Sequence, residues 1–128
     1  MICVGEGAGA LALAASAFTL SWTHSVERTE WRERWVVERG ALRLTDASVM
    51  GSGAGIDPPE GAVLRDGAYH WRPTLPPVPQ LALAASGATP GGWTLCPSKG
   101  ACVLLGTTPG EPIAVRACPG AQPMNPAR

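Results

Sequence analysis

The chain has 128 residues, with ten Lys or Arg and ten Asp or Glu, so its formal net charge is zero. This length suits one domain with a single core, and the balanced charge argues against nucleic acid as a partner, since phosphate binding needs a basic patch or stripe. Because 16 Gly and 13 Pro keep regular elements short, the composition favours an all-β fold over a helical one.

The first apolar segment is ALALAASAF at residues 10–18. It is the candidate for the hydrophobic part of a signal peptide, but no basic residue precedes it and it continues directly into a strand pattern, so we predict no signal peptide. Localisation stays open: a start upstream of Met1 would allow an export signal and an extracytoplasmic protein, and otherwise the protein is cytoplasmic. No apolar run reaches the roughly 18 residues that a membrane span needs, so we predict no transmembrane span.

Alternation of apolar and polar residues predicts three consecutive strands, at 18–26, 31–38 and 41–49. Further along, Asp66 and Gly67 are a strong signal for a tight hairpin between two short strands. Three more short strands are expected at 80–85, 92–96 and 102–106. The predicted fold is a small antiparallel β-sandwich or partly open barrel of about eight to ten short strands.

The C-terminal segment has a different composition. Residues 107–128 are rich in Pro and Gly and show little apolar periodicity, which is typical of a disordered tail. The sequence therefore predicts a single all-β domain over 1–106 followed by a disordered tail over 107–128.

The register of the first hairpin follows from its apolar residues. If 27–30 form the loop, Trp22 lies opposite Trp35 and His24 lies directly opposite Glu33. Apolar side chains then face apolar side chains along the rest of the hairpin. The sequence therefore places an imidazole beside a carboxylate on an otherwise apolar face.

The second hairpin extends this polar row. A turn at Arg39 and Gly40 places Glu33 opposite Asp46, so that His24, Glu33 and Asp46 are predicted to lie side by side on three adjacent strands. Two neighbouring carboxylates need a cation or a shared proton between them. A charged imidazole at His24 can supply the positive charge.

Three interpretations of this row are open. It is a structural polar network at the open end of the sandwich, a site for a divalent cation or small ligand, or a catalytic site. One imidazole and two carboxylates suit zinc or manganese. Ser25 follows His24 directly and points to the opposite face of a regular strand, so the two cannot act as nucleophile and base.

A glycine loop and four cysteines complete the candidate features. The GSGAG stretch at 51–55 resembles a phosphate-binding loop superficially, but no helix can start in the IDPP that follows, so a bulge or tight strand exit is the favoured role. No cysteine spacing matches a zinc or redox motif. Cys96 and Cys102 flank a turn-like stretch and are candidates for a disulfide, with two free thiols as the alternative.

Three stretches together resemble a known family. FTLSWTHSVERTEWRERW, LRLTDASVMGSGAGIDPPEGAVLRDGAYHWRP and LALAASGATPGGWTLC are similar to the domain-of-unknown-function 1850 family of small bacterial proteins, and the resemblance covers about residues 1–105. Its most specific parts are THSVE and GSGAG. The matching positions are His24, Ser25, Val26, Glu27, Glu33, Gly51, Gly53 and Gly55.

The resemblance implies a partner but no reaction. Members of that family are typically encoded beside TAXI-type TRAP transporters, which are secondary transporters fed by an extracytoplasmic solute-binding protein, and no activity is established for them. We therefore expect a non-enzymatic accessory or ligand-binding domain that works with components of such a transporter. The candidate ligand-binding residues are His24, Ser25, Glu27, Glu33, Asp46, Gly51, Gly53 and Gly55.

The alternative is a metal-dependent hydrolase or cation-binding protein that uses His24, Glu33 and Asp46. Against it, the second histidine, His70, lies in a separate hairpin. We expect no cofactor apart from this divalent cation.

Overall fold

Two antiparallel β-sheets pack face to face in the computed structural model, which describes residues 1–23, 29–50, 58–85 and 92–119. One sheet has seven strands in the order β10-β9-β3-β4-β5-β7-β6, and the other has four in the order β2-β1-β11-β8. Within the described residues there is one 3-10 turn, η1 (Gly7–Gly9), and no α-helix. The predicted all-β sandwich is confirmed.

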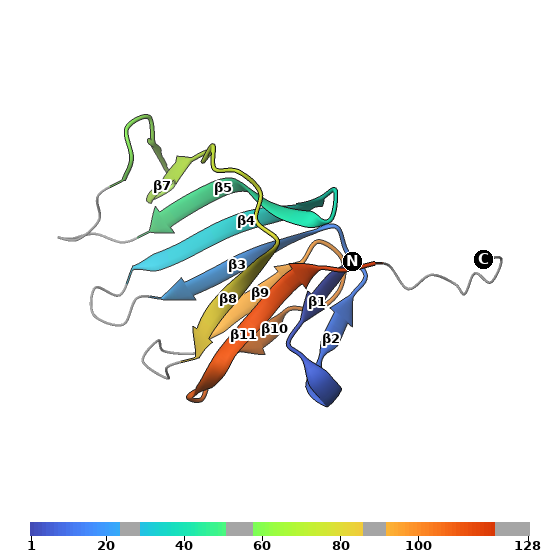
Figure 1. Cartoon of the computed structure of the whole chain (residues 1–128). Coiled ribbons are helices and arrows are strands. Elements are labelled where there is room, and N and C mark those ends of the chain that lie inside the picture. The colour runs from blue at the N-terminus through green and yellow to red at the C-terminus, as the bar shows by residue number, and fades with distance from the viewer. Residues whose placement is uncertain (24–28, 51–57, 86–91, 120–128) are drawn as a thin grey trace.

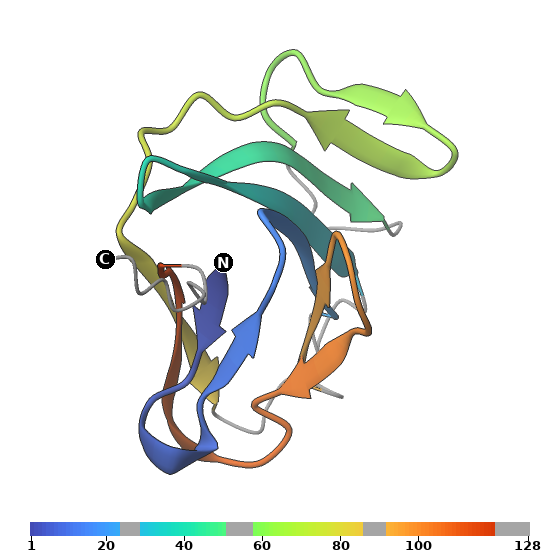
Figure 2. The same ribbon diagram turned by 90° about the vertical axis from the view of Figure 1, so that its right-hand side faces the viewer.

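The strands of the four-stranded sheet are β1 (Ile2–Val4), β2 (Leu11–Leu13), β8 (Gln80–Ala85) and β11 (Gly110–Ala117). Those of the seven-stranded sheet are β3 (Ala17–Thr23), β4 (Glu30–Glu38), β5 (Ala41–Met50), β6 (Val63–Arg65), β7 (Ala68–Trp71), β9 (Trp93–Pro97) and β10 (Val103–Leu105). Figure 1 shows β3, β4 and β5 side by side in one layer, with β8 and β11 in the other. Figure 2, which shows the molecule turned by 90°, shows that the seven-stranded sheet is curved. In this view its β6–β7 hairpin extends beyond the four-stranded sheet.

The core lies between the two sheets and draws on both. Alternate residues of each strand point inward because successive side chains of a strand face opposite ways. Phe18, Leu42, Leu95 and Val115 are completely buried. The whole cluster comprises Ile2, Val4, Phe18, Leu20, Trp35, Leu42, Leu44, Leu83, Leu95 and Val115.

Two tight turns take the backbone conformation expected of their residues. Asp66 and Gly67 have φ of 54° and 81°, and the pair joins β6 to β7 as predicted. Arg39 and Gly40, with φ of 54° and 77°, join β4 to β5. Positive φ at both central residues matches the right-handed twist of the flanking strands, and Gly takes it without steric cost.

The predicted register of the first hairpin is wrong by four residues. Trp22 lies opposite Trp31, Leu20 opposite Glu33, and Phe18 opposite Trp35. This register also keeps the aromatic residues on the inner face, because a shift by an even number of residues does not change the face of any side chain. Period-two patterning therefore could not distinguish the two alignments.

The second hairpin follows the prediction near its turn and departs from it further along. Trp35 lies opposite Leu44, as predicted, but a register shift between Arg34 and Trp35 places Arg34 opposite Asp46. Such a β-bulge adds one residue to one strand and reverses which side chains beyond it face inward. The predicted opposition of Glu33 and Asp46 is therefore wrong.

The C-terminal strand corrects the predicted domain boundary. Residues 110–117 form β11, which lies between β1 and β8 in the four-stranded sheet, so the folded region does not end near residue 106. The prolines that suggested disorder stand where a strand tolerates them: Pro109 precedes β11, Pro112 lies in its irregular stretch, and Pro119 follows it.

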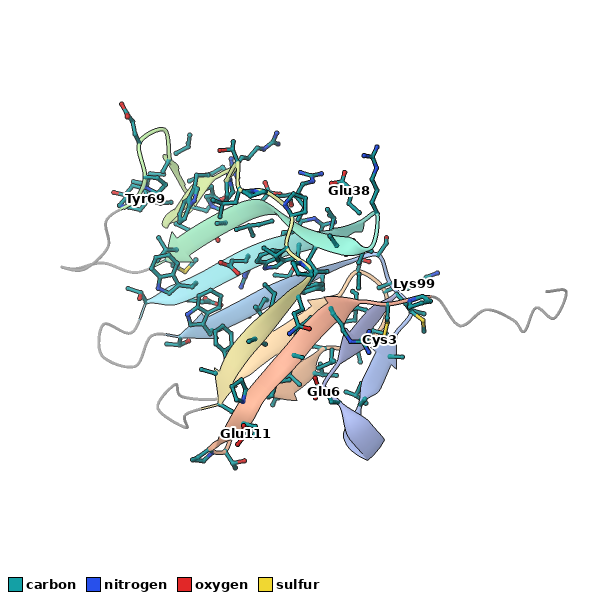
Figure 3. The ribbon with its side chains drawn as sticks, viewed as in Figure 1. Cys3, Glu6, Glu38, Tyr69, Lys99 and Glu111 are labelled. Atoms are coloured by element: carbon teal, nitrogen blue, oxygen red, sulfur yellow. A yellow bond between two sulfur atoms is a disulfide. The ribbon has the colours of Figure 1, made fainter. Side chains whose placement is uncertain are left out.

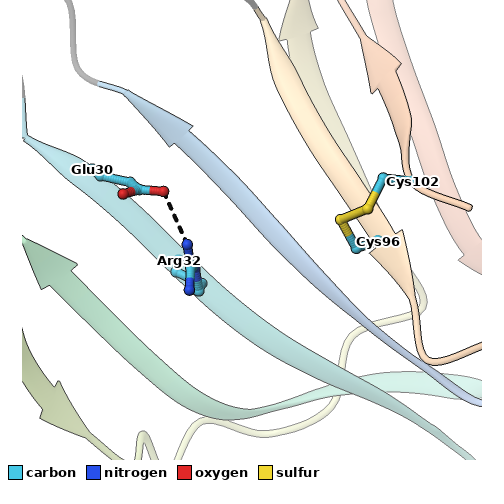
Figure 4. Close-up of polar contacts among 4 residues, drawn as sticks. All are labelled: Glu30, Arg32, Cys96 and Cys102. Atoms are coloured by element: carbon cyan, nitrogen blue, oxygen red, sulfur yellow. Dashed lines mark hydrogen bonds and ion pairs between the residues drawn. A yellow bond between two sulfur atoms is a disulfide. The ribbon is translucent and has the colours of Figure 1, made fainter.

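Two disulfides use all four cysteines. Cys3 of β1 bonds to Cys118, which directly follows β11, across a sequence separation of 115. Cys96 of β9 bonds to Cys102, the candidate pair from the sequence, with Cα atoms 4.0 Å apart (Figure 4). The first bridge ties the two ends of the folded chain together, and the second closes the β9–β10 hairpin.

Candidate functional site

Most of the residues predicted to bind a ligand lie outside the ranges that the structure describes. These residues are His24, Ser25, Glu27, Gly51, Gly53 and Gly55. Their roles, including that of His24 as a metal ligand, stay predictions. Glu33 and Asp46 are the two candidates that the structure places.

Glu33 and Asp46 lie on opposite faces of the seven-stranded sheet. Glu33 lies opposite the buried Ala47 on the inner face, whereas Asp46 lies opposite the exposed Arg34. The Thr45 hydroxyl donates a 2.8 Å hydrogen bond to Asp46, and the Arg72 Nε lies 3.6 Å from the same carboxylate. The bulge between the two acids therefore separates them, and the ranges in the structure contain no group of three or more His, Cys, Asp or Glu that could hold a metal ion.

Four tryptophans from four strands contact one another on the inner face, and we call them the tryptophan cluster: Trp93 of β9, Trp22 of β3, Trp31 of β4 and Trp71 of β7. The Trp22 and Trp31 rings are nearly parallel, with centroids 6.3 Å apart. The Trp93 ring lies 4.8 Å from Trp22 and is tilted by 50°. Trp71 meets Trp31 edge to face at 6.4 Å.

Strand register explains how the cluster forms. Trp22 and Trp31 are directly opposed, and the same alignment of β3 with β9 brings Trp93 beside Trp22. On the other side, β5 contributes the small Ala47, which lies opposite Trp71. A small side chain at this point of β5 leaves room for the Trp71 ring to reach Trp31 across the strand.

The cluster is held in place yet stays partly exposed. The Trp93 indole N–H donates a 2.9 Å hydrogen bond to the Ala84 carbonyl of β8, which links the two sheets. All four indoles retain some solvent exposure. Tyr69, which lies opposite Val49 in the row that contains Trp31, lies at the end of the molecule away from Cys3 and Lys99 (Figure 3). The cluster therefore occupies that end.

Glu33 lies at the boundary between the tryptophan cluster and the core. Its neighbours across the sheet are Leu20 and Ala47. Burial in these apolar surroundings raises the pKa of the Glu33 carboxyl, and a hydrogen bond from the Trp35 indole, 3.0 Å from Nε1 to Oε1, opposes that rise. An ionisable group in such a position is a candidate for a functional role.

An open depression of about 850 Å³ lies beside β5, β6 and β7, and its lining includes Ala47 and Trp71 of the inner face as well as residues of the outer face. Its ionisable lining is mixed, with Asp46 and Glu60 beside Arg65, His70 and Arg72. On the outer face of β4, Arg32 pairs with Glu30 at 3.0 Å (Figure 4). Exposed pairs of this kind contribute little energy, so this face has the properties of an ordinary solvated surface.

Sequence reasoning placed part of the cluster correctly. It put Trp22 and Trp31 on the inner face, but assigned them to the core. It missed the contacts of Trp71 and Trp93, because these depend on the pairing of strands that are distant in the sequence. The signal that could have found the cluster is the position of these tryptophans at strand ends, where one end of a sandwich opens to water.

Comparison with known proteins identifies a family for most of the chain. Residues 18–105 match the model of the family described as Domain of unknown function (DUF1850). No curated protein and no solved structure matches the chain. The matched span runs from β3 to β10 and so includes the tryptophan cluster and Glu33. The residues that the structure describes contain no helix long and apolar enough to cross a membrane.

Proposed function

The chain belongs to the DUF1850 family, a family of unknown function, and from this premise we propose that it is a non-enzymatic ligand-binding domain that works outside the cytoplasm with a TAXI-type TRAP transporter. The observation that carries the proposal is the tryptophan cluster. Four aromatic rings that contact one another and keep solvent exposure offer a broad, rigid apolar surface to a ligand.

The two disulfides support the extracytoplasmic location. Structural disulfides form and persist in oxidising compartments and are rare in the cytosol. Here every cysteine of the chain is paired. The family resemblance supports the transporter partner, since members of the family are typically encoded beside TAXI-type TRAP transporters. These transporters receive their solute from an extracytoplasmic binding protein.

We favour binding over hydrolysis because of where the acids lie. A metal-dependent hydrolase built on Glu33 and Asp46 needs both carboxylates at one ion, and the bulge in β4–β5 directs them to opposite faces. The aromatic surface, in contrast, is brought together on one face of the sheet by four strands.

The proposal is tested by ligand screening with the purified, oxidised protein. Amines, carboxylates and sugars are titrated while tryptophan fluorescence is recorded, and one class is expected to change the emission and saturate. Trp31→Ala should remove this response. Leu104→Ala, a change at an exposed apolar residue of the edge strand β10, should keep it.

The transporter link has its own readout. In cells that express a TAXI-type TRAP transporter, the domain should increase solute uptake, and Trp31→Ala should remove the increase while Leu104→Ala retains it. Uptake that is the same with and without the domain would contradict the proposed partner. The absence of a saturating response to every solute class would contradict the binding function itself.

A further inference from the structure

Glu33 differs from the other acids of β4 in its partners. Glu30 pairs with Arg32, and Glu38 pairs with Arg43 at 2.6 Å. The hydrogen bond that Glu33 accepts comes from the neutral Trp35 indole, and no ion pair joins it to another residue in the described part of the chain. A carboxylate in an apolar setting is costly unless a cation or several donors satisfy it.

The arginines next to Glu33 in sequence do not satisfy it. Arg32 and Arg34 are its direct neighbours, and strand alternation directs them to the outer face, where both are exposed. On the inner face, the residues opposite Glu33 are Leu20 and Ala47, which carry no polar group. The strands on either side therefore bring no positive charge to this carboxylate.

The surroundings of Glu33 suit a cation that is itself partly apolar. Trp31 precedes it by two residues on the same face, and Trp22 lies opposite Trp31. Indole faces attract ammonium and guanidinium groups through the negative charge of the ring face, and tryptophan does so most strongly of the aromatic residues. Because the Trp22 and Trp31 planes differ by only 9° and Trp93 is tilted by 50° to Trp22, the rings form an angled surface, and Glu33 follows Trp31 on the same face of β4.

We infer that the tryptophan cluster binds small organic cations, with Glu33 as the counter-charge. This inference rests on the proposed binding function and specifies its ligand class: an alkylammonium or quaternary ammonium compound, whose methyl groups contact the indoles and whose charge faces Glu33. A bare divalent cation would find one carboxylate and no second charged ligand from the neighbouring strands, and an organic acid would be repelled by the charge of Glu33.

The experiment compares a cation with its uncharged isostere. Choline and 3,3-dimethylbutan-1-ol have nearly the same shape, but only choline carries a charge. Each is titrated into the purified, oxidised full chain, with tryptophan fluorescence and calorimetry as readouts. Choline should bind at least about tenfold more tightly than the alcohol, since a charged partner for a carboxylate is worth roughly that factor or more.

The variants assign the effect to Glu33. Glu33→Gln keeps the shape and the acceptor for the Trp35 indole, and it should weaken choline binding about tenfold or more while leaving the weak binding of the alcohol unchanged. Glu30→Gln is the matched control, because it removes the same charge from the opposite face of the same strand. It should leave choline binding at the wild-type level.

The outcomes separate the ligand class from the binding function. Equal binding of choline and the alcohol, or a Glu33→Gln variant that binds choline as the wild type does, would overturn the organic-cation assignment. A carboxylate or sugar that saturates the fluorescence response while choline does not would also overturn it, and would leave the proposed binding function intact. No response to any solute class would contradict both.

Discussion

The strand pair β3–β4 carries two stacked aromatic pairs, one toward each end of the sandwich. Phe18 and Trp35 have ring centroids 6.5 Å apart and planes 12° apart, and Trp22 and Trp31 have values of 6.3 Å and 9°. The first pair is buried, with Phe18 completely inaccessible and Trp35 8% exposed. The second pair is partly exposed. Nearly identical local geometry therefore occurs in two different environments.

The opposite sheet makes the difference. Phe18 and Trp35 belong to the core cluster together with Ile2 and Val4 of β1 and Val115 of β11, and the Cys3–Cys118 bridge joins those two strands. Trp22 packs against the margin of that cluster, and Trp31 does not belong to it. Strand pairing therefore positions an aromatic pair, whereas the covering sheet decides whether the pair stabilises the fold or is available to a ligand.

The largest expected effect is on the free energy of unfolding and concerns the Cys3–Cys118 disulfide, which joins the strands that cover Phe18 and Trp35. Replacing both Cys3 and Cys118 with Ser should lower the free energy of unfolding by about 5 kcal/mol, because the bridge closes a very long loop in the unfolded chain. Replacing both Cys96 and Cys102 with Ser should lower it by only about 2 kcal/mol, since that loop is short. Urea denaturation of the two double variants measures both losses. Equal losses would show that the long bridge does not restrain the unfolded chain more than the short bridge does.

The next effect tests the two aromatic pairs directly. Trp35→Ala should cost about 3 to 5 kcal/mol of stability, as expected for truncation of a large buried aromatic side chain. Trp31→Ala should cost less, about 2 kcal/mol, because a partly exposed side chain loses less buried apolar area and leaves no closed cavity. Denaturant titrations of the two variants provide the measurement. If Trp31→Ala were as costly as Trp35→Ala, Trp31 would be a core residue and the ligand-binding role of the cluster would lose its basis.

The fold class could be predicted because it depends on local properties. Alternation identified β3, β4 and β5, and the Asp66–Gly67 pair identified the hairpin between β6 and β7. The strand β11 was missed because its Pro and Gly content resembles that of a disordered segment. Its stability comes from partners that are far away in sequence, β1 and β8, and from the Cys3–Cys118 bridge.

The candidate site was harder to predict for two physical reasons. A four-residue shift of the β3–β4 register keeps every side chain on its face, so the apolar pattern alone could not exclude the wrong alignment. The bulge beside Arg34 leaves no signal in the apolar pattern, yet it sends Asp46 to the outer face. The half-buried position of Glu33 on the inner face was predictable, whereas its neighbours were not.

The smallest expected effect is on the pH dependence of stability, and it reports on Glu33 at the boundary between the two ends. Burial raises the pKa of Glu33 above its ordinary value of 4.5 in the folded protein, so folding opposes its ionisation. At a pH well below 4.5 the carboxyl is protonated in both states and carries no penalty. As pH rises, the unfolded state loses this proton first, and stability falls until the folded state is ionised as well.

Glu33→Gln removes this penalty. The free energy of unfolding of the variant, relative to that of the wild type, should therefore be lowest near pH 4 and should increase between pH 4 and pH 7. Urea denaturation of both proteins across this range measures the difference. Glu30→Gln is the control: Glu30 is exposed and paired with Arg32 on the outer face, so its relative stability should not increase with pH. A Glu33→Gln variant whose relative stability stays constant or decreases from pH 4 to pH 7 would mean that the folded protein already satisfies the ionised carboxylate. The site would then have no deficit of positive charge for an organic cation to fill, and the aromatic surface would bind its ligand through apolar contact alone.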